Sequence, residues 1–433
     1  MKQHITLQVA GCDTNKSLAD WLTWLETLHP QEIELGLDRV RQVFQRQKLT
    51  PLARKIVVVA GTNGKGSTIA MLETILLNAG YSVGSYTSPH LRYFNERVRV
   101  GGIDMDDRSL CRAFARVERA RGSTSLSYFE FGTLAAFDLF SRHKLDIVLL
   151  EVGLGGRLDA VNLIDADISV ITNIDIDHEE WLGSDREAIG VEKAGVMRPQ
   201  RATVCGERDL PESIRNKAEQ IGAELFVLGE DFDYHRHGKE WDWSEKQSSQ
   251  VKSLPQPALN GECQYDNAAV VVAVLKKLVD FPVDDFDIIE GLESVQCRGR
   301  YENSGDELPC IFDVAHNPAS AAALAKTLAV QPVAGKTRVV FGVMADKDIE
   351  AMIIELNEQV GQWYLAAPDI ARAAEPAMVE DVCINNGVSA AAVSCFSSVK
   401  QAVEQALEEC GENDRVVVCG SFYTVAEAMA LQV

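Results

Sequence analysis

Long apolar runs are missing from this sequence. No segment approaches the roughly 20 uncharged apolar residues that a membrane-spanning helix needs. Residues 1–11 also lack the charged, apolar and cleavage regions of a secretory signal peptide. We therefore expect no membrane partner.

Paired cysteines are missing as well. The ten cysteines are scattered singly, and none belongs to a Cys-x-x-Cys pair, so a structural zinc site is not expected. Reduced thiols are the simplest interpretation, and they are typical of the cytoplasm. We expect the protein to be located there.

Positive charge is scarce. The 42 lysines and arginines are outnumbered by 64 aspartates and glutamates, which gives a net charge of −22. This balance argues against nucleic acid or an anionic membrane as the main partner, although a local basic site can still bind a small anion. Hydrophobic residues make up 46% of the 433 residues, enough to form the cores of two or three domains.

The first chemical motif is a glycine loop between a strand and a helix. The run Ile56–Ala60 leads into the segment GTNGKGS at 61–67, and apolar residues at helical spacing follow. The glycines let backbone N–H groups approach phosphate, the helix start adds partial positive charge, and Lys65 adds a cation. The spacing does not fit Gly-x-x-x-x-Gly-Lys-Ser/Thr, so a turn without a ligand is the alternative.

Polar residues also follow other predicted strands. Asp146–Leu150 leads to Glu151, Ile168–Thr172 leads to His178, and Ser88 follows a strand near 81–86. Parallel α/β sheets place their sites at the carboxyl ends of strands, so these side chains could hold Mg²⁺ beside the glycine loop. A solvated acid at 151 and an ordinary loop histidine at 178 are the alternatives.

Helical spacing dominates much of the remaining N-terminal part. Residues 97–100 alternate like an edge strand that ends at Gly101-Gly102. Aromatic and polar residues alternate between 225 and 255, which predicts a small antiparallel excursion. Helices are predicted over 17–29, up to about 47, 106–121, 129–143 and 265–280.

A domain boundary is expected at the segment QCRGRY, residues 296–301. Strands and helices alternate again after it, and the late strand Arg415–Cys419 leads into a final helix. We therefore predict an α/β protein with a mostly parallel, P-loop-type sheet domain at 1–296 and a smaller Rossmann-like domain at 297–433. We expect a monomer.

Taken together, these stretches resemble the folylpolyglutamate synthase/dihydrofolate synthase family, ATP-dependent amide-forming enzymes related to the Mur ligases. They occur in the family's order and span most of the chain, and the shortened glycine loop is itself a family feature. The matching segments are LGLDR (35–39), GTNGKGS (61–67), TSPHL (87–91), ERVR (96–99), FEF (129–131), EVGLGGRLDA (151–160), DH (177–178), EKAG (192–195) and DVAHNP (313–318).

The resemblance implies roles for individual residues. The residues expected to bind ATP are Asn63, Gly64, Lys65, Gly66, Ser67, Asn267, Arg300 and Asp313. Two Mg²⁺ ions are expected, with ligands among Ser88, Glu151 and His178. The residues expected to line a pterin pocket are Gly36, Leu37, Asp38, Arg39, Phe129, Glu130, Leu158, Asp159 and Ala160.

Catalytic roles are implied for Lys65, Lys193 and His316. By composition alone Lys193 is an ordinary surface lysine, and Arg300 could form a plain interdomain salt bridge. The resemblance implies instead that Lys193 carries a carbamate. A carbamate turns a cation into an anionic oxygen ligand, which explains how a lysine could serve a metal site.

The resemblance also implies a reaction. The γ-phosphoryl group of ATP would activate a carboxylate as an acyl phosphate, and the amine of L-glutamate would displace phosphate to form an amide. The expected acceptors are dihydropteroate and reduced folates, held in a cleft that closes against water. A synthase limited to polyglutamate extension, a nucleotide-binding protein that does not ligate, and a small-molecule kinase are the alternatives.

Overall fold

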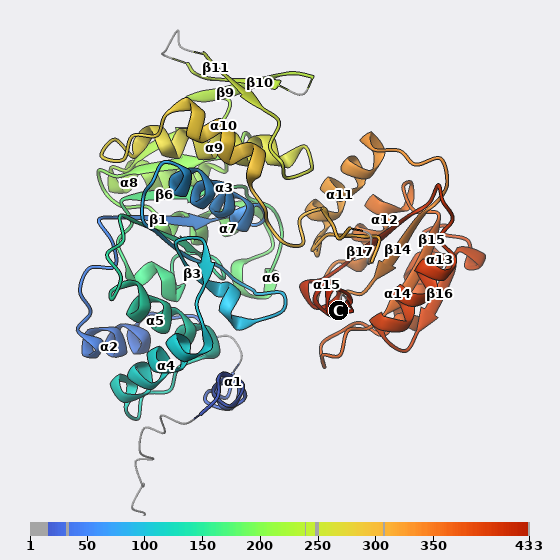
Figure 1. Cartoon of the computed structure of the whole chain (residues 1–433), viewed down its shortest axis with the longest axis horizontal. Coiled ribbons are helices and arrows are strands. Elements are labelled where there is room, and N and C mark those ends of the chain that lie inside the picture. Colours follow the sequence, from blue (N-terminus) through green and yellow to red (C-terminus); the bar gives the residue numbers. More distant parts are fainter. Residues whose placement is uncertain (1–15, 32–33, 239, 247–250, 306–307, 432–433) are drawn as a thin grey trace, which may run out of the picture.

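Two sheets organise the chain into two α/β domains, which lie side by side in the computed structural model (Figure 1). The structure describes residues 16–31, 34–238, 240–246, 251–305 and 308–431. The larger N-terminal domain is coloured blue to yellow, and the smaller C-terminal domain orange to red. This architecture confirms the predicted fold class, while the exact boundary between residues 296 and 297 stays a prediction.

The N-terminal sheet has eight strands within the described residues. In spatial order they are β4 (Ile103–Asp104), β3 (Val98–Val100), β2 (Val83–Tyr86), β5 (Ile147–Glu151), β1 (Lys55–Ala60), β6 (Ile168–Ile171), β7 (Ala202–Cys205) and β8 (Glu224–Val227). From β2 to β8 the neighbouring strands are parallel, whereas β3 and β4 add an antiparallel edge. The carboxyl ends of β1, β5 and β6 therefore share one edge of the sheet.

Side chains of the central strand alternate between two cores. Val57 and Val59 of β1 pack into one hydrophobic cluster, and Val58 and Ala60 into the other. Such a strand reads as a continuous apolar run because helices cover both faces of the sheet. The helices on the Val57 face are α3 (Lys65–Asn78), α9 (Cys263–Lys277) and α10 (Asp285–Ser294).

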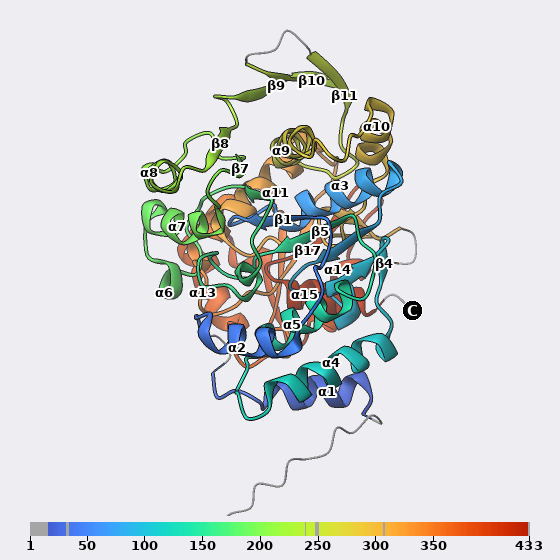
Figure 2. The same cartoon turned by 90° about the vertical axis from the view of Figure 1, so that its left-hand side faces the viewer.

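The opposite face carries the first two helices of the chain and most of the middle ones. They are α1 (Leu18–Glu26), α2 (Asp38–Gln47), α4 (Asp107–Arg121), α5 (Tyr128–Phe140), α6 (Glu179–Leu182), α7 (Arg186–Lys193) and α8 (Glu212–Ile221). Figure 2 shows α1, α2, α4 and α5 gathered at the lower end of the molecule. The short 3₁₀ helices of the domain are η1 (Phe94–Arg97), η2 (Ala160–Leu163) and η3 (Ala194–Val196).

A three-stranded antiparallel sheet lies over α9, at the upper end in Figures 1 and 2. Its strands are β9 (Phe232–His237), β10 (Glu240–Glu245) and β11 (Val251–Pro255). Trp241 and Trp243 are buried, and Trp243 Nε1 donates to the Ala269 carbonyl of α9 at 3.1 Å. The antiparallel excursion predicted from alternating aromatic residues is therefore confirmed.

The C-terminal sheet has six strands within the described residues. In spatial order they are β12 (Glu302–Asn303), β13 (Cys310–Phe312), β17 (Arg415–Cys419), β14 (Thr337–Phe341), β15 (Gln362–Ala366) and β16 (Val393–Phe396). All neighbours from β13 to β16 are parallel, and β12 is antiparallel to β13. Helices cover both faces, with α11 (Pro318–Val330), α12 (Ile349–Asn357) and α13 (Pro376–Asn385) on one side and α14 (Val399–Glu408) and α15 (Phe422–Met429) on the other. A short 3₁₀ helix, η4 (Ala390–Ala392), precedes β16.

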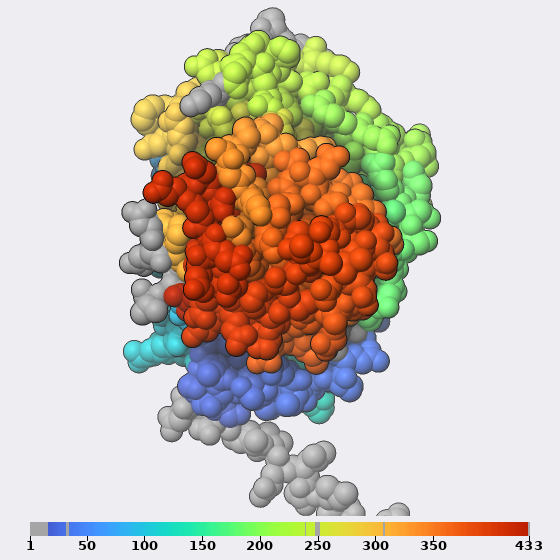
Figure 3. Space-filling view, turned by 90° about the vertical axis from the view of Figure 1, so that its right-hand side faces the viewer, coloured from blue at the N-terminus to red at the C-terminus, as the bar shows by residue number. Residues whose placement is uncertain are grey.

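Figure 3 looks onto the C-terminal domain from outside. The orange and red domain covers the middle of the N-terminal domain, with the blue helices emerging below it and the green hairpin sheet above. Within the described ranges, none of the helices combines the length and the hydropathy that crossing a lipid bilayer requires.

Several sequence predictions differ from the structure in detail. The helices predicted over 129–143 and 265–280 end at Phe140 and Lys277. The helix predicted over 17–29 ends at Glu26. The strand near 97–100 is not at the edge, because the chain turns back at Gly101 and Gly102 and forms β4 outside it. Both glycines have positive φ, +62° and +76°, which is the conformation that a two-residue hairpin turn needs.

Close packing between α10 and α3 generates a stability prediction. A Cβ added at Gly291 of α10 would lie 2.3 Å from Ile75 Cγ1 and 3.0 Å from Ile75 Cα of α3. Gly291→Ala should therefore lower the free energy of unfolding by about 1–3 kcal/mol through overpacking, which outweighs the gain of up to about 1 kcal/mol that alanine brings to a helix. Urea denaturation measures this change.

The exposed Glu293 of the same helix offers a control. Glu293→Ala should change the free energy of unfolding by no more than about 0.5 kcal/mol. Equal stability of Gly291→Ala and the wild type would contradict the close approach of α10 to α3.

Candidate active site

Two cavities lie against each other where the strands end. The first has a volume of about 300 Å³ and is lined by the 61–67 loop and the C-terminal domain; we call it the loop cavity. The second has a volume of about 730 Å³ and lies between the ends of α1 and α5; we call it the helix cavity. They share five lining residues, namely Ser88, Pro89, Gly153, Leu154 and His178.

The 61–67 loop has a backbone shape that only glycine tolerates at two positions. Gly61 has φ +144° and Gly64 has φ +85°. A Cβ at Gly61 would lie 1.8 Å from Thr172 Oγ1, and a Cβ at Gly64 would lie 2.5 Å from Asn267 Oδ1. Thr172, which follows β6, and Asn267 in the first part of α9 therefore pack closely against the loop.

Hydrogen bonds from the β6 end complete the support of the loop. Thr172 Oγ1 donates to the Asn63 carbonyl at 2.6 Å, and the Asn63 N–H donates to Asn173 Oδ1 at 2.7 Å. The first residues of α3 line the loop cavity, and the first N–H groups of a helix, which have no partner within the helix, are a common binding site for phosphate.

Lys65 is the cation of the loop. Its Nζ donates to the carbonyls of Gly61 and Thr62, each at 3.0 Å. Burial lowers the pKa of Lys65, and the nearby charges of Glu151 and Asp177 oppose that shift. The side chain lines the loop cavity, so an anion there would meet a poorly solvated ammonium group.

Glu151, Ser88 and His178 meet around the junction of the cavities, as the strand-end argument predicted. Glu151 Oε2 accepts the Ser88 N–H at 2.9 Å, and burial raises the pKa of Glu151 against the pull of Lys65. Burial lowers the pKa of His178 to about 4, so its imidazole is neutral at pH 7. A buried carboxylate, a hydroxyl and a neutral imidazole are a donor set that a divalent cation can use.

Lys193 ends α7 and lines the loop cavity. Its side chain is buried, with only 3% of the residue exposed, and the hydrogen bonds and ion pairs among the described residues give its amine no partner. Burial, followed by the charge of Lys65, lowers the pKa of Lys193 to about 7. The position is therefore not the solvated surface lysine of the alternative interpretation.

The linker and the C-terminal domain supply the far wall of the loop cavity. Arg300 lies near the start of α3, because a Cβ at Gly66 would be 3.5 Å from its guanidinium. Asp313 follows β13 and accepts N–H groups of Tyr301 and Ala315 at 3.0 and 2.8 Å. Burial raises the pKa of Asp313, and Arg300 opposes that shift.

His316 also lines the loop cavity. Its Nδ1 donates to the Val314 carbonyl at 2.8 Å, so Nε2 faces Asp177 at 3.6 Å. Burial alone would raise the pKa of Asp177, but contact with His316 and the cations around it hold that pKa far below its ordinary value. Asn267, the remaining residue expected at the nucleotide, donates from Nδ2 to Gln264 Oε1 at 3.0 Å and lines the same cavity.

The helix cavity contains most of the residues expected at a pterin pocket. Its walls include Gly36, Phe129, Glu130, Leu158, Asp159 and Ala160. Leu37, Asp38 and Arg39 lie outside its lining. Arg39 supports the wall instead, because its Nε donates to both Glu130 oxygens at 2.9 Å and it pairs with Glu34. Direct ligand contacts of these three residues stay a prediction.

Asp159 shapes the loop between the two cavities. Its carboxylate accepts the backbone N–H groups of Gly153, Leu154 and Val161 at 3.0, 2.9 and 2.9 Å. Burial raises the pKa of Asp159 to about 6. The glycine-rich 153–160 segment is therefore folded around a buried acid, and this brings Gly153 and Leu154 to the junction of the cavities.

Sequence reasoning missed several walls of the site. Leu25 of α1 and His29, which follows α1, line the helix cavity. Ile370 and Tyr423 line the same cavity from the C-terminal domain. Nothing in the pattern of a helix end or a distant loop signals such contacts. Lys347 was also missed, because a lysine between two aspartates in a loop has the composition of a solvated turn.

Two family models match the chain and cover both domains. Residues 59–275 match the Mur ligase middle domain, and residues 299–422 match the Mur ligase glutamate ligase domain. The dihydrofolate synthase/folylpolyglutamate synthase of Escherichia coli K12 is 41% identical over 412 residues, which are 95% of this chain and 94% of the relative. The enzyme of the same name from Haemophilus influenzae is 37% identical over 434 residues, covering 96% of this chain and 97% of the relative.

Solved structures are similar over the same length. Escherichia coli FolC in complex with DHPP and ADP has a TM-score of 0.90 at 40% identity, covering 96% of this chain and 98% of that one. A bifunctional folylpolyglutamate synthase/dihydrofolate synthase with Mn, AMPPNP and L-glutamate bound has a TM-score of 0.89 at 43% identity, with the same coverage.

Identity at this level along nearly the whole length, with the two Mur ligase domains in order, decides the relationship. The chain belongs to the dihydrofolate synthase/folylpolyglutamate synthase family and is an ATP-dependent ligase of that family.

Proposed function

We propose that this enzyme uses ATP to join L-glutamate to dihydropteroate, forming dihydrofolate, and to reduced folates, extending their glutamate tails. The observation that carries the proposal is the junction of the two cavities at Ser88 and His178. A carboxylate that enters from the helix cavity would meet there the terminal phosphate of a nucleotide in the loop cavity. Relatives that hold DHPP with ADP, and AMPPNP with L-glutamate, support both halves of the proposal.

The loop cavity is proposed to bind ATP through Asn63, Gly64, Lys65, Gly66 and Ser67. Backbone N–H groups at the α3 start would hold the phosphates, and the Lys65 ammonium would follow the phosphoryl group during its transfer. From the opposite wall, Arg300 would add a second cation near the phosphates. Asn267 and Asp313 line the same cavity and complete the proposed nucleotide site.

Two Mg²⁺ ions are part of the proposal, with Ser88 and Glu151 at one and His178 at the other. Bound there, the ions would neutralise charge on the phosphates. Within the described residues no group of three or more histidine, cysteine, aspartate or glutamate side chains could hold a metal ion by itself. Protein ligands alone are therefore few, and phosphate oxygens and a modified Lys193 would supply the rest.

Lys193 is proposed to carry a carbamate. A pKa of about 7 leaves a large neutral fraction of the amine at neutral pH. The neutral amine can attack CO₂, lose a proton and become an anion with two oxygen ligands. Burial beside Lys65 disfavours the ammonium form and favours this anion, because opposite charges attract strongly where solvent screening is weak.

The helix cavity is proposed to bind the pterin end of the folate, with Phe129, Leu158 and Ala160 as apolar walls. Asp159 and Glu130 offer carboxylates beside them. A carboxylate is a poor acceptor for an amine, because its leaving group would be oxide. Phosphorylation gives the acyl carbon a good leaving group, and the α-amine of glutamate then displaces phosphate. His316, in the far wall of the loop cavity, is proposed to take part on the glutamate side.

Reduced thiols, a cytoplasmic location and a monomeric state complete the proposal. The nine cysteines within the described residues are free, which supports a reducing compartment. The strong negative charge supports a small-molecule enzyme without a nucleic-acid partner.

Glutamate-dependent release of ADP tests the function directly. We expect turnover of ATP with dihydropteroate plus L-glutamate, and with tetrahydrofolate plus L-glutamate, and only background turnover when glutamate is left out. A coupled ADP assay measures both reactions. Turnover that ignores glutamate would exclude the ligase, and turnover with the second pair alone would reduce the enzyme to polyglutamate extension.

Removal of the amine tests the carbamate. Lys193→Ala should lower kcat by about 10²-fold, as losses around metal sites typically do, and a short carboxylate such as acetate should restore part of the activity. Because the neutral form of Lys193 increases as pH rises through about 7, wild-type enzyme depleted of CO₂ should recover faster at pH 8 than at pH 6 when dissolved CO₂, the species that the amine attacks, is held at the same concentration. Full activity of Lys193→Ala would rule the carbamate out.

An exposed lysine provides the matched control for that variant. Lys276 lies on α9 with its side chain exposed. Lys276→Ala should keep wild-type kcat and should not respond to acetate.

A pair of glycines tests the phosphate loop. Gly64 and Gly80 have nearly equal φ, +85° and +82°, but a Cβ meets Asn267 at Gly64 and nothing within 4 Å at Gly80. Alanine at either position should cost about 1 kcal/mol of stability for the left-handed backbone. Only Gly64→Ala should weaken ADP binding, by about tenfold or more, as measured by calorimetry. Equal ADP affinities of the two variants would contradict the proposed phosphate site.

A further inference from the structure

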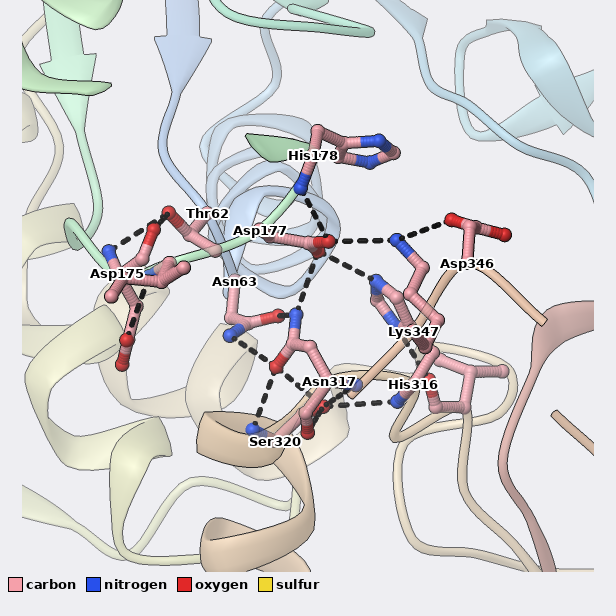
Figure 4. Close-up of polar contacts among 12 residues, drawn as sticks. Thr62, Asn63, Asp175, Asp177, His178, His316, Asn317, Ser320, Asp346 and Lys347 are labelled. Carbon is pink, nitrogen blue, oxygen red and sulfur yellow. Dashed lines mark hydrogen bonds and ion pairs between the residues drawn. The ribbon is translucent and has the colours of Figure 1, made fainter. Parts of the chain in front are cut away.

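A polar cluster joins the two domains beside the loop cavity (Figure 4). It consists of Asn63 and Asp177 from the N-terminal domain and Asn317 and Lys347 from the C-terminal domain; we call these four residues the latch. Lys347 lies in the loop between β14 and α12, and Asn317 caps the start of α11.

Asp177 is the centre of the latch. Lys347 Nζ lies 2.7 Å from Asp177 Oδ1, and Asn317 Nδ2 donates to Asp177 Oδ2 at 2.9 Å. The side chains of Lys347 and Asp177 are only 10% and 7% exposed. Removing one partner of a buried ion pair is costly, because the other charge stays buried and uncompensated.

The same carboxylate holds the backbone of His178. Asp177 Oδ1, which receives Lys347, also accepts the His178 N–H at 2.8 Å. His178 has φ +54°, a left-handed conformation that a non-glycine residue adopts at some cost in energy. In Figure 4 the His178 N–H points to Asp177 while its imidazole points away from the cluster. That imidazole lines both cavities.

A second arm of the latch reaches the phosphate loop. The side-chain amides of Asn63 and Asn317 bond reciprocally, at 3.2 and 3.1 Å. Asn317 is 1% exposed. As the N-cap of α11, it also accepts the Ser320 N–H at its Oδ1, at 2.9 Å. The phosphate loop is therefore in direct contact with a rigid helix start of the other domain.

Lys347 lies outside the lining of both cavities. By contrast, Asn63 and Asp177 of the latch both line the loop cavity. The close contact of Lys347 with the site is therefore the ion pair with Asp177, and its charge adds to the effect of burial in lowering the pKa of His178. Its remaining acidic neighbour, Asp346, lies 3.5 Å away and is 45% exposed, so solvent screens that pair.

We propose that Lys347 is a positioning residue for the ligase reaction. By binding Asp177 from the C-terminal domain, it fixes the left-handed His178 and, with Asn317, sets the phosphate loop against the closed interdomain cleft. The effect of Lys347 on catalysis rests on the proposed function, whereas the contact between the two domains rests on the latch alone.

Four variants test this role in the full-length enzyme. Lys347→Met removes the charge, Lys347→Arg keeps it, and Asp177→Asn removes its partner. Lys326→Met is the matched control, because Lys326 is an exposed lysine of α11 in the same domain. Circular dichroism checks that each variant folds, and Lys347→Gln replaces Lys347→Met with the same expectations if the methionine variant does not fold.

Steady-state kinetics give the first readout. Lys347→Met should lower kcat by about 10²-fold, the size of loss expected when reacting groups are misplaced by about 1 Å, and should change KM for ATP far less. Lys347→Arg should stay within about tenfold of the wild type, and Lys326→Met should match it. If Lys347 acts through Asp177, the double variant Lys347→Met/Asp177→Asn should lose little more than Asp177→Asn alone.

Domain closure gives the second readout and does not depend on turnover. With AMPPNP and Mg²⁺, small-angle X-ray scattering should give one radius of gyration for the wild type, Lys347→Arg and Lys326→Met, and a larger one for Lys347→Met. Wild-type kcat in Lys347→Met, independent losses in the double variant, or unchanged closure would each overturn the proposal. A wild type that releases no ADP in response to glutamate would refute the proposed function, while the scattering comparison would still decide on the latch.

Discussion

Charge held out of water at the carboxyl ends of two sheets is the constraint on which this structure depends. Glu151 and Lys193 are buried and Lys65 is half-buried around one cavity, and each pKa is shifted by desolvation in the direction that disfavours its charge. The parallel sheet brings Glu151 at the end of β5 to the same edge as the loop that follows β1 and leads to Lys65, and the end of α7 adds Lys193. The fold thus gathers poorly solvated charges, and a bound nucleotide with its cations would compensate them.

The second domain changes what this edge can do. Asp313, Arg300 and His316 approach from the far wall of the loop cavity, while Ile370 and Tyr423 reach the helix cavity. Reactive acyl phosphates hydrolyse when water reaches them, so a site made of two domains offers both access and exclusion of solvent. In the described structure the two domains already meet through buried polar groups, which is a more specific contact than an apolar interface.

The sequence predicted the parts of this structure that local patterns encode. The apolar run at β1, the glycine loop and the alternating aromatic residues of β9 and β10 each have a periodicity that dictates one element. The convergence of strand ends in a parallel sheet predicted that Ser88, Glu151 and His178 lie together, and they line one cavity. Their role as metal ligands stays a prediction. Residues whose position depends on the packing of two domains gave no such signal. Lys347 looks like a solvated loop lysine, and nothing in the sequence signals that Arg39 pairs with Glu130 and Glu34.

The two neighbours that press on Gly61 and Gly64 explain how a phosphate loop can be shorter than the common one. A standard loop encircles phosphate with its own length of chain, whereas here Thr172, Asn173 and Asn267 provide the rim from other elements. The binding shape is therefore distributed over β1, β6 and α9. Grafting the seven residues 61–67 onto another strand and helix would transfer the sequence of the loop without its shape, because Thr172 and Asn267 would be left behind.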